Sequence, residues 1–126
     1  MEYEHFIDKV EQLSFIQDRE TADAAVKAVL GILASRLTED EAQKLTSRLP
    51  GPLSLERLRG HQVRTEKISV DEYIVEVAQQ FKLSGEDAQK LIMTVLHQAK
   101  EALGGETTSE LEHVLPADWK ETIEKA

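Results

Sequence analysis

The sequence contains no cysteine, and only 5% of its 126 residues are aromatic. The absence of cysteine excludes disulfides, thiolate metal sites and cysteine nucleophiles, and it fits a reducing compartment. No apolar run approaches the roughly 20 residues that a membrane-spanning helix needs. The start, Met1-Glu2-Tyr3-Glu4, is acidic where a secretion signal would be basic. We therefore expect a cytoplasmic protein that does not enter a membrane.

Basic residues are also in deficit, with 15 Lys and Arg against 24 Asp and Glu, which gives a net charge of −9. Nucleic-acid binding depends on clustered cations that release counterions, so this composition argues against it for the surface as a whole. One stretch is locally basic, with Arg57, Arg59, Arg64 and Lys67. We expect it to be a polar connector, and these four residues are candidate contacts for a partner or an anionic ligand.

What the sequence does contain is helical periodicity along almost its whole length. Tyr3, Phe6, Ile7 and Val10, for example, are spaced as one face of a helix. No segment shows the sustained alternation of apolar and polar residues that a half-buried strand requires. The fold class predicted from this pattern is all-α.

The helical pattern occurs twice, with positions 20–50 matching positions 86–116 without a gap, 66 residues further on. The identical pairs are Glu20 and Glu86, Ala22 and Ala88, Val29 and Val95, Leu30 and Leu96, Leu37 and Leu103, Leu45 and Leu111, Leu49 and Leu115, and Pro50 and Pro116. Most of these residues are apolar, so the shared feature is packing. We predict a single domain made of two tandem four-helix repeats, at about 1–60 and 68–126, that pack around a pseudo-twofold axis.

Helix ends are indicated by capping residues and by glycine and proline. Asp18 and Ser84 are expected to cap the two long helices, and Gly104-Gly105 to stop the second of them. Asp118 is expected to cap the last helix. Three pairs have the spacing of a capping box: Thr38 with Glu41, Ser69 with Glu72, and Thr107 with Glu110.

Several short motifs together carry a family resemblance that covers nearly the whole chain. They are Ala28-Val29-Leu30, Leu33, Arg36-Leu37-Thr38, Glu41-Ala42, Leu45, Leu49-Pro50, Val70-Asp71-Glu72-Tyr73 and Leu115-Pro116-Ala117-Asp118-Trp119. With these motifs the chain resembles the bacterial domain-of-unknown-function 2267 family. The resemblance implies a compact all-helical bacterial domain, and it brings no established activity, catalytic residue or cofactor.

A search for metal sites finds Glu-x-x-His at residues 2–5 and 110–113, the motif of di-iron helical bundles. A further pair, one helical turn apart, lies on the second long helix. Zinc needs three or four ligands, and neither long helix has an acidic residue on its apolar face, so we predict no metal, cofactor or catalytic site. The candidate ligands that these patterns leave are His97, Glu101, Glu110 and His113.

Trp119, the only tryptophan, follows the last proline. We expect it to seal the end of the bundle, and the alternative is a partner-binding anchor. The function predicted from these observations is a non-enzymatic interaction or scaffold module that binds a protein or itself. Two alternatives stay open: a small metal-binding or enzymatic bundle, and a regulator that binds nucleic acid or an anionic ligand through the basic connector.

Overall fold

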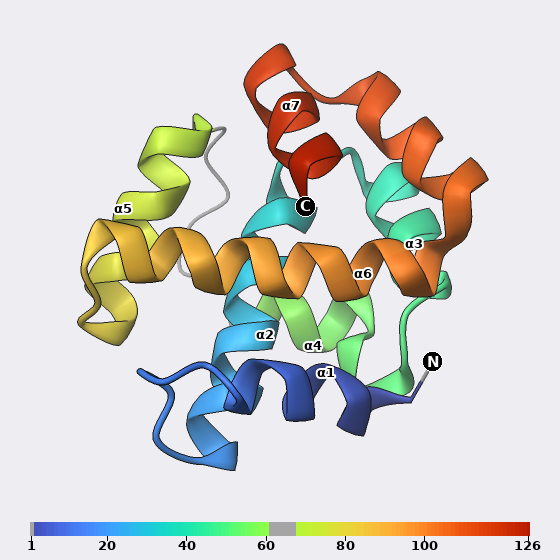
Figure 1. Cartoon of the computed structure of the whole chain (residues 1–126). Coiled ribbons are helices and arrows are strands. Elements are labelled where there is room, and N and C mark those ends of the chain that lie inside the picture. The colour runs from blue at the N-terminus through green and yellow to red at the C-terminus, as the bar shows by residue number, and fades with distance from the viewer. Residues whose placement is uncertain (1, 61–67) are drawn as a thin grey trace.

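The computed structural model describes residues 2–60 and 68–126, and within these ranges it contains helices and no strands (Figure 1). The all-helical prediction is confirmed. The helices are α1 (Tyr3–Glu11), α2 (Arg19–Ser35), α3 (Glu39–Ser47), the 3₁₀ helix η1 (Gly51–Leu53), α4 (Leu55–Gly60), α5 (Val70–Phe81), α6 (Gly85–Val114) and α7 (Ala117–Lys125).

Most helix starts are where the local sequence predicts them. The side chain of Asp18 accepts a hydrogen bond from the backbone N–H of Thr21 at 2.7 Å, and Ser84 accepts one from the N–H of Asp87 at 3.1 Å. The two capping boxes that begin at Thr38 and Ser69 are both present. Each of these side chains satisfies an amide that the first turn of a helix would otherwise leave unpaired.

The helix break that we expected at Gly104-Gly105 is present at Gly104, but the third capping box is wrong, because the second part of α6 begins directly after Gly104 and already contains Thr107. Gly104 takes a left-handed conformation, with φ 80° and ψ 167°, and α6 resumes directly after it. Figure 1 shows the part after Gly104, here called the C-terminal segment of α6 (residues 105–114), turning away from the first part. Gly104 therefore makes a kink, and Thr107 lies buried inside the helix.

The predicted cap at Asp118 is also wrong. The N-cap of α7 is Pro116, which makes no side-chain capping bond, and Asp118 is already the second residue of the helix. Its carboxylate instead accepts a hydrogen bond at 2.9 Å from the backbone N–H of Val70, the first residue of α5. Asp118 therefore ties α7 to the start of α5.

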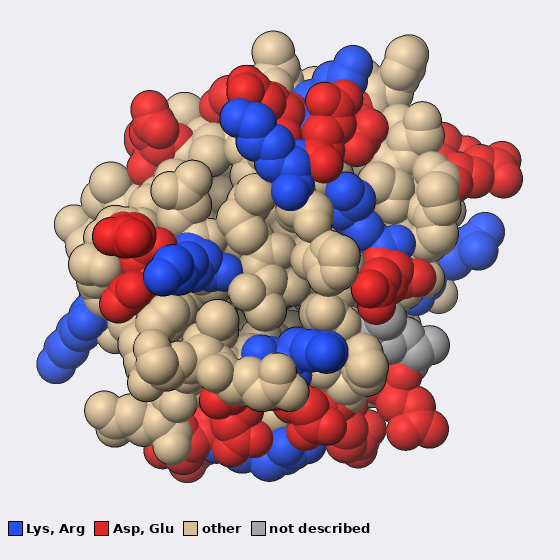
Figure 2. Space-filling view, in the orientation of Figure 1, with Lys and Arg blue, Asp and Glu red and all other residues tan. Residues whose placement is uncertain are grey.

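Helix α6 crosses the middle of the molecule and contacts α1, α2, α3, α5 and α7 (Figure 1). The apolar core draws on both halves of the chain, with Phe6, Leu30 and Leu91 among its fully buried side chains. Tyr73 and Trp119 stack within this core with their ring centroids 4.6 Å apart. On the face in Figure 2, acidic and basic side chains are interspersed around an uncharged area.

Two buried hydrogen bonds hold this aromatic pair in place. The hydroxyl of Tyr73 donates to the carbonyl oxygen of Val29 at 2.7 Å, and the indole N–H of Trp119 donates to the carbonyl oxygen of Ile68 at 3.0 Å. Burial raises the pKa of Tyr73 well above its ordinary value, so this hydroxyl keeps its proton. The pair therefore connects α2, α5 and α7.

None of the helices in the described ranges combines the length and the apolar character that crossing a membrane requires.

Candidate interaction groove

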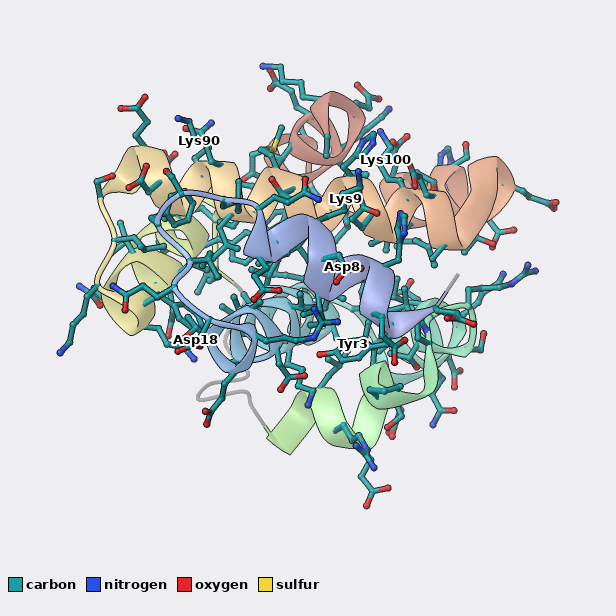
Figure 3. All side chains as sticks on the ribbon, turned by 60° about the horizontal axis from the view of Figure 1, so that its bottom comes forward. Tyr3, Asp8, Lys9, Asp18, Lys90 and Lys100 are labelled. Atoms are coloured by element: carbon teal, nitrogen blue, oxygen red, sulfur yellow. The ribbon has the colours of Figure 1, made fainter. Side chains whose placement is uncertain are left out.

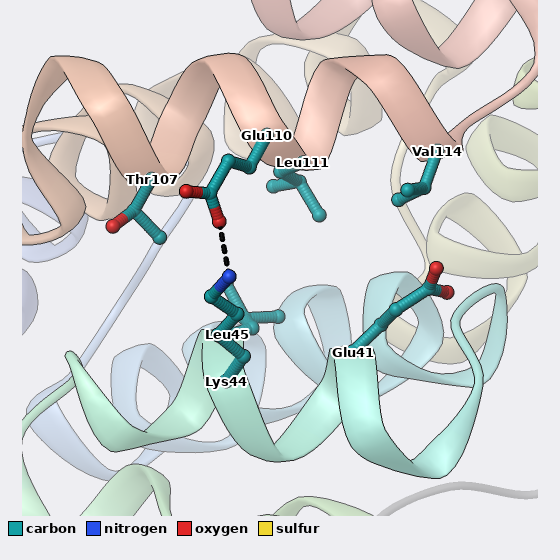
Figure 4. A pocket seen from close by; sticks show the side chains of 7 residues that line it. All are labelled: Glu41, Lys44, Leu45, Thr107, Glu110, Leu111 and Val114. Atoms are coloured by element: carbon teal, nitrogen blue, oxygen red, sulfur yellow. Dashed lines mark ion pairs between the residues drawn. The ribbon is translucent and has the colours of Figure 1, made fainter.

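A hollow of about 100 Å³ lies between α3 and the C-terminal segment of α6 (Figure 4). Figure 4 shows the side chains of both helices pointing toward one another across it. The residues that line it are Glu41, Lys44 and Leu45 from α3, and Thr107, Glu110, Leu111 and Val114 from α6. We call this hollow the α3/α6 groove.

The floor of the groove is apolar. Leu45 and Leu111 are buried, with 2% and 8% of their surface exposed, and they belong to the core cluster. Val114 lies at the mouth and is 47% exposed, and within the described ranges only Val75 on α5 is a comparably exposed large apolar side chain. Val75 does not line this hollow. The groove thus joins an exposed apolar side chain to the core.

Charged side chains border the floor. Lys44 and Glu110 form an ion pair across the groove, with 2.5 Å between the ammonium nitrogen and a carboxylate oxygen. Both side chains are largely exposed, at 65% and 45%, so the pair contributes about 0–1 kcal/mol to stability. At the other end of the groove, Glu41 faces Val114 (Figure 4).

The position of Glu41 is fixed by its role in the capping box of α3. One of its carboxylate oxygens accepts a hydrogen bond from the backbone N–H of Thr38 at 3.0 Å. No ion pair joins Glu41 to a basic side chain within residues 2–60 and 68–126. Its negative charge therefore remains available at the mouth of the groove.

The size of the groove limits what it can hold. Pockets for small-molecule ligands usually enclose roughly 300–1,000 Å³, and this hollow measures about 100 Å³. An engineered cavity of about 150 Å³ in another protein holds benzene. The space is therefore suited to a single apolar side chain.

The four candidate metal ligands are not brought together. His97 and Glu101 lie 3.2 Å apart on the first part of α6, and the other ring nitrogen of His97 is 2.8 Å from the carbonyl oxygen of Ala126. Glu110 and His113 lie beyond the kink, where Glu110 pairs with Lys44. No group of three or more His, Asp or Glu side chains in the described part of the chain is arranged to hold a metal ion.

The candidate partner contacts differ in their exposure to solvent where the structure describes them. Arg57 is exposed on α4, while the side chain of Arg59, and Arg64 and Lys67 altogether, lie outside the described residues. Trp119 has no exposed surface, and the guanidinium of Arg36 lies 5.7 Å from the centre of its ring. A partner could not reach Trp119 without moving the residues that cover it.

The sequence analysis missed a polar cluster that joins α1 to α2. The hydroxyl of Tyr3 donates a short hydrogen bond to a carboxylate oxygen of Asp23, whose other oxygen pairs with Lys27 at 3.1 Å (Figure 3 labels Tyr3). Burial, and then the contact with Asp23, raise the pKa of Tyr3 above its ordinary value. These contacts fit a structural role, because the hydroxyl of Tyr3 and the carboxylate of Asp23 are both engaged in holding α1 against α2.

The α3/α6 groove was missed as well. Leu45 and Leu111 were identified as matched residues of the two halves, but that signal says nothing about which surfaces meet. The matched positions would have predicted the groove only if we had assumed that the two matched helices pack against each other.

No curated protein and no solved structure matches the chain. Residues 3–122 match the family described as "Uncharacterized conserved protein (DUF2267)", which covers nearly all of the chain, and the protein therefore belongs to this family.

Proposed function

We propose that this protein is a non-enzymatic helical module that binds a protein partner through the α3/α6 groove. The observation that carries the proposal is the apolar floor between two helices, with Val114 left 47% exposed at its mouth. A partner that inserts one apolar side chain would cover Val114 and remove it from water. Because Val114 is 47% exposed, covering the rest of it is worth about half of the value for a fully exposed side chain, or about 1 kcal/mol.

The chemistry of the groove favours binding over catalysis. Its titratable side chains are Glu41, Lys44 and Glu110, and the last two neutralise each other across the groove. Catalytic acids, bases and nucleophiles usually lie in a cleft that shields them from water. Lys44 and Glu110 are instead exposed to solvent, which screens their interaction.

We also propose that the chain consists of two four-helix repeats around a pseudo-twofold axis. In this assignment α1 corresponds to α5, α2 to the first part of α6, α3 to the C-terminal segment of α6, and α4 to α7. The contacts support it by their reciprocity: α1 packs on both α2 and α6, while α5 packs on both α6 and α2. Reciprocal contacts are the mark of packing about a twofold axis.

The groove supports the same assignment. Lys44 and Glu110 occupy positions 66 residues apart, as do Leu45 and Leu111, and all four line one hollow. Matched positions meet one another where a twofold axis passes between them. In the proposed arrangement the groove therefore lies on the axis, where the two halves present matched residues to a common partner.

The test is an affinity capture from the native cell lysate with three forms of the protein. Val114→Asn makes the mouth of the groove polar, and Val75→Asn is the matched control, because Val75 is 54% exposed on α5. Valine and asparagine have similar helix propensities, so neither change should unfold its helix. We expect a stoichiometric protein that the wild type and Val75→Asn retain and Val114→Asn loses. Equal recovery with both variants would rule out the groove as the contact.

A further inference from the structure

We infer that the partner presents a cationic segment, in which one aliphatic side chain enters the α3/α6 groove and a lysine or arginine beside it pairs with Glu41. This inference rests on the proposed function and adds to it the chemistry of the partner. It is carried by the position of Glu41, by the charge of α3, and by the difference between the two ends of the groove.

Glu41 is placed to receive a cation next to the apolar floor. Its carboxylate is held by the bond to the N–H of Thr38 and faces Val114 at the open end of the groove (Figure 4). A basic side chain adjacent to the inserted aliphatic one would reach Glu41 without leaving the mouth. Partly buried ion pairs of this kind are screened less than exposed ones, so they contribute to specificity.

The first turn of α3 adds to the negative potential at this end. It carries Glu39, Asp40 and Glu41 in succession, and the first two are exposed. The start of a helix offsets this by roughly half a positive charge, so Asp40 and Glu41 alone already leave the turn negative. A cationic segment is therefore attracted to the end of the groove where the apolar mouth is open.

Lys44 does not oppose such a partner, because its charge is compensated within the groove. Its ammonium nitrogen lies 2.5 Å from a carboxylate oxygen of Glu110. The pair forms the closed end of the groove, and Glu41 with Val114 forms the open end (Figure 4). The partner's cation is thus directed toward Glu41 and away from Lys44.

A second copy of this chain is a poor occupant on the same grounds. Each copy carries a net charge of −9, so two copies repel one another as they approach. An acidic partner segment would face the same repulsion at the first turn of α3. Charge complementarity therefore selects a basic partner.

Positions 66 residues apart show how the open end differs from its counterpart. Val114 matches Arg48, which is exposed, and Glu41 matches Thr107, which is buried. An exposed arginine is what a solvated helix face ordinarily carries, and Val114 takes that place in the groove. The open end thus combines the apolar Val114 with the carboxylate of Glu41, whereas the matched positions carry an arginine and a threonine.

The experiment measures binding of three labelled synthetic peptides of equal length by fluorescence anisotropy. The first is an amphipathic helix of leucine and lysine, the second replaces every lysine with glutamate, and the third has the first one's composition with the leucines dispersed. The proteins are the wild type, Val114→Asn, Glu41→Gln, and the matched control Val75→Asn. Gln can still complete the capping box, so Glu41→Gln leaves α3 intact.

We expect the leucine–lysine helix to bind the wild type and Val75→Asn alike, and Val114→Asn about tenfold more weakly, the size expected when one buried apolar side chain loses its contact. Glu41→Gln should weaken binding by about threefold at low salt, with a smaller effect at about 0.15 M salt. The glutamate peptide and the dispersed peptide should bind markedly less than the first.

Two results would overturn the inference, and they separate it from the proposed function. If the glutamate peptide binds at least as tightly and Val114→Asn weakens it, the groove is the contact but the partner is not cationic. If the leucine–lysine helix binds Val114→Asn and Val75→Asn equally, its attraction is general to the acidic surface. The lysate capture then decides whether the groove has any partner.

Discussion

Replacement of the buried tryptophan should reveal how much the aromatic pair contributes to stability. Trp119→Phe keeps an aromatic ring against Tyr73 but removes the indole N–H that donates to the carbonyl oxygen of Ile68. A lost hydrogen bond of this kind costs about 1 kcal/mol, and the smaller ring loses contacts worth about another 1 kcal/mol. We therefore expect the free energy of unfolding to fall by about 2 kcal/mol.

The assay is urea unfolding followed by far-ultraviolet circular dichroism, since the variant has no tryptophan to report by fluorescence. In the wild type, Trp119 is the only tryptophan, so its fluorescence should follow the same transition as the dichroism if unfolding is two-state. At about 3–5 °C per kcal/mol for a chain of this size, the midpoint of thermal unfolding should fall by about 6–10 °C.

Lys120→Ala is the matched control, because Lys120 is the exposed neighbour of Trp119 on α7. It should change the free energy of unfolding by less than about 0.5 kcal/mol. If Trp119→Phe has an effect as small as this control, the contacts of Trp119 with Tyr73 and Ile68 do not hold α7 to α5, and our account of the core is wrong.

Two further predictions concern the kink and the polar cluster of α1. Gly104→Ala should lower the free energy of unfolding by about 1–2 kcal/mol, because a side chain strains the backbone at φ 80°. Gly105→Ala is the control and should be neutral or stabilising. Equal effects of the two substitutions in urea titrations would show that the positive φ at Gly104 is not required. Tyr3 has a pKa raised above its ordinary value of 10.0, so the stability it adds is complete below that pH and is lost as the pH rises above it. Tyr3→Phe should therefore lose stability less steeply than the wild type between pH 9 and about pH 11, although Tyr73 acts in the same sense and some slope should remain; identical slopes would contradict the role of Tyr3.

The features that the sequence predicted well are those that depend on a few neighbouring residues. Asp18 and Ser84 cap their helices, and the boxes that begin at Thr38 and Ser69 form, because each needs only an amide three residues away. The cap expected at Asp118 fails because a partner 48 residues away, the N–H of Val70, holds that carboxylate. Local spacing gave no indication of this competing contact.

The candidate sites fail or stay open for a related reason. The spacing of His97 with Glu101, and of Glu110 with His113, predicts only that the members of each pair lie on one side of a helix. It cannot predict what faces that side, and in the structure Lys44 of α3 faces Glu110. The α3/α6 groove was missed for the same reason, since it joins residues of α3 and α6 that lie more than 60 positions apart in the sequence.

The positions that line the groove separate the requirements of folding from those of binding. Leu45 and Leu111 are matched and identical, and both belong to the core, so substitutions there should lower stability and binding together. Glu41 and Val114 differ from their matched residues, Thr107 and Arg48, and they lie at the mouth. Val114→Asn and Glu41→Gln should cost little stability there, because Val114 is exposed and Gln can still complete the capping box. A change in partner binding without a change in unfolding should therefore be confined to the mouth. This distinction separates a binding surface from a packing defect, because a defect in packing would alter both measurements at either set of positions.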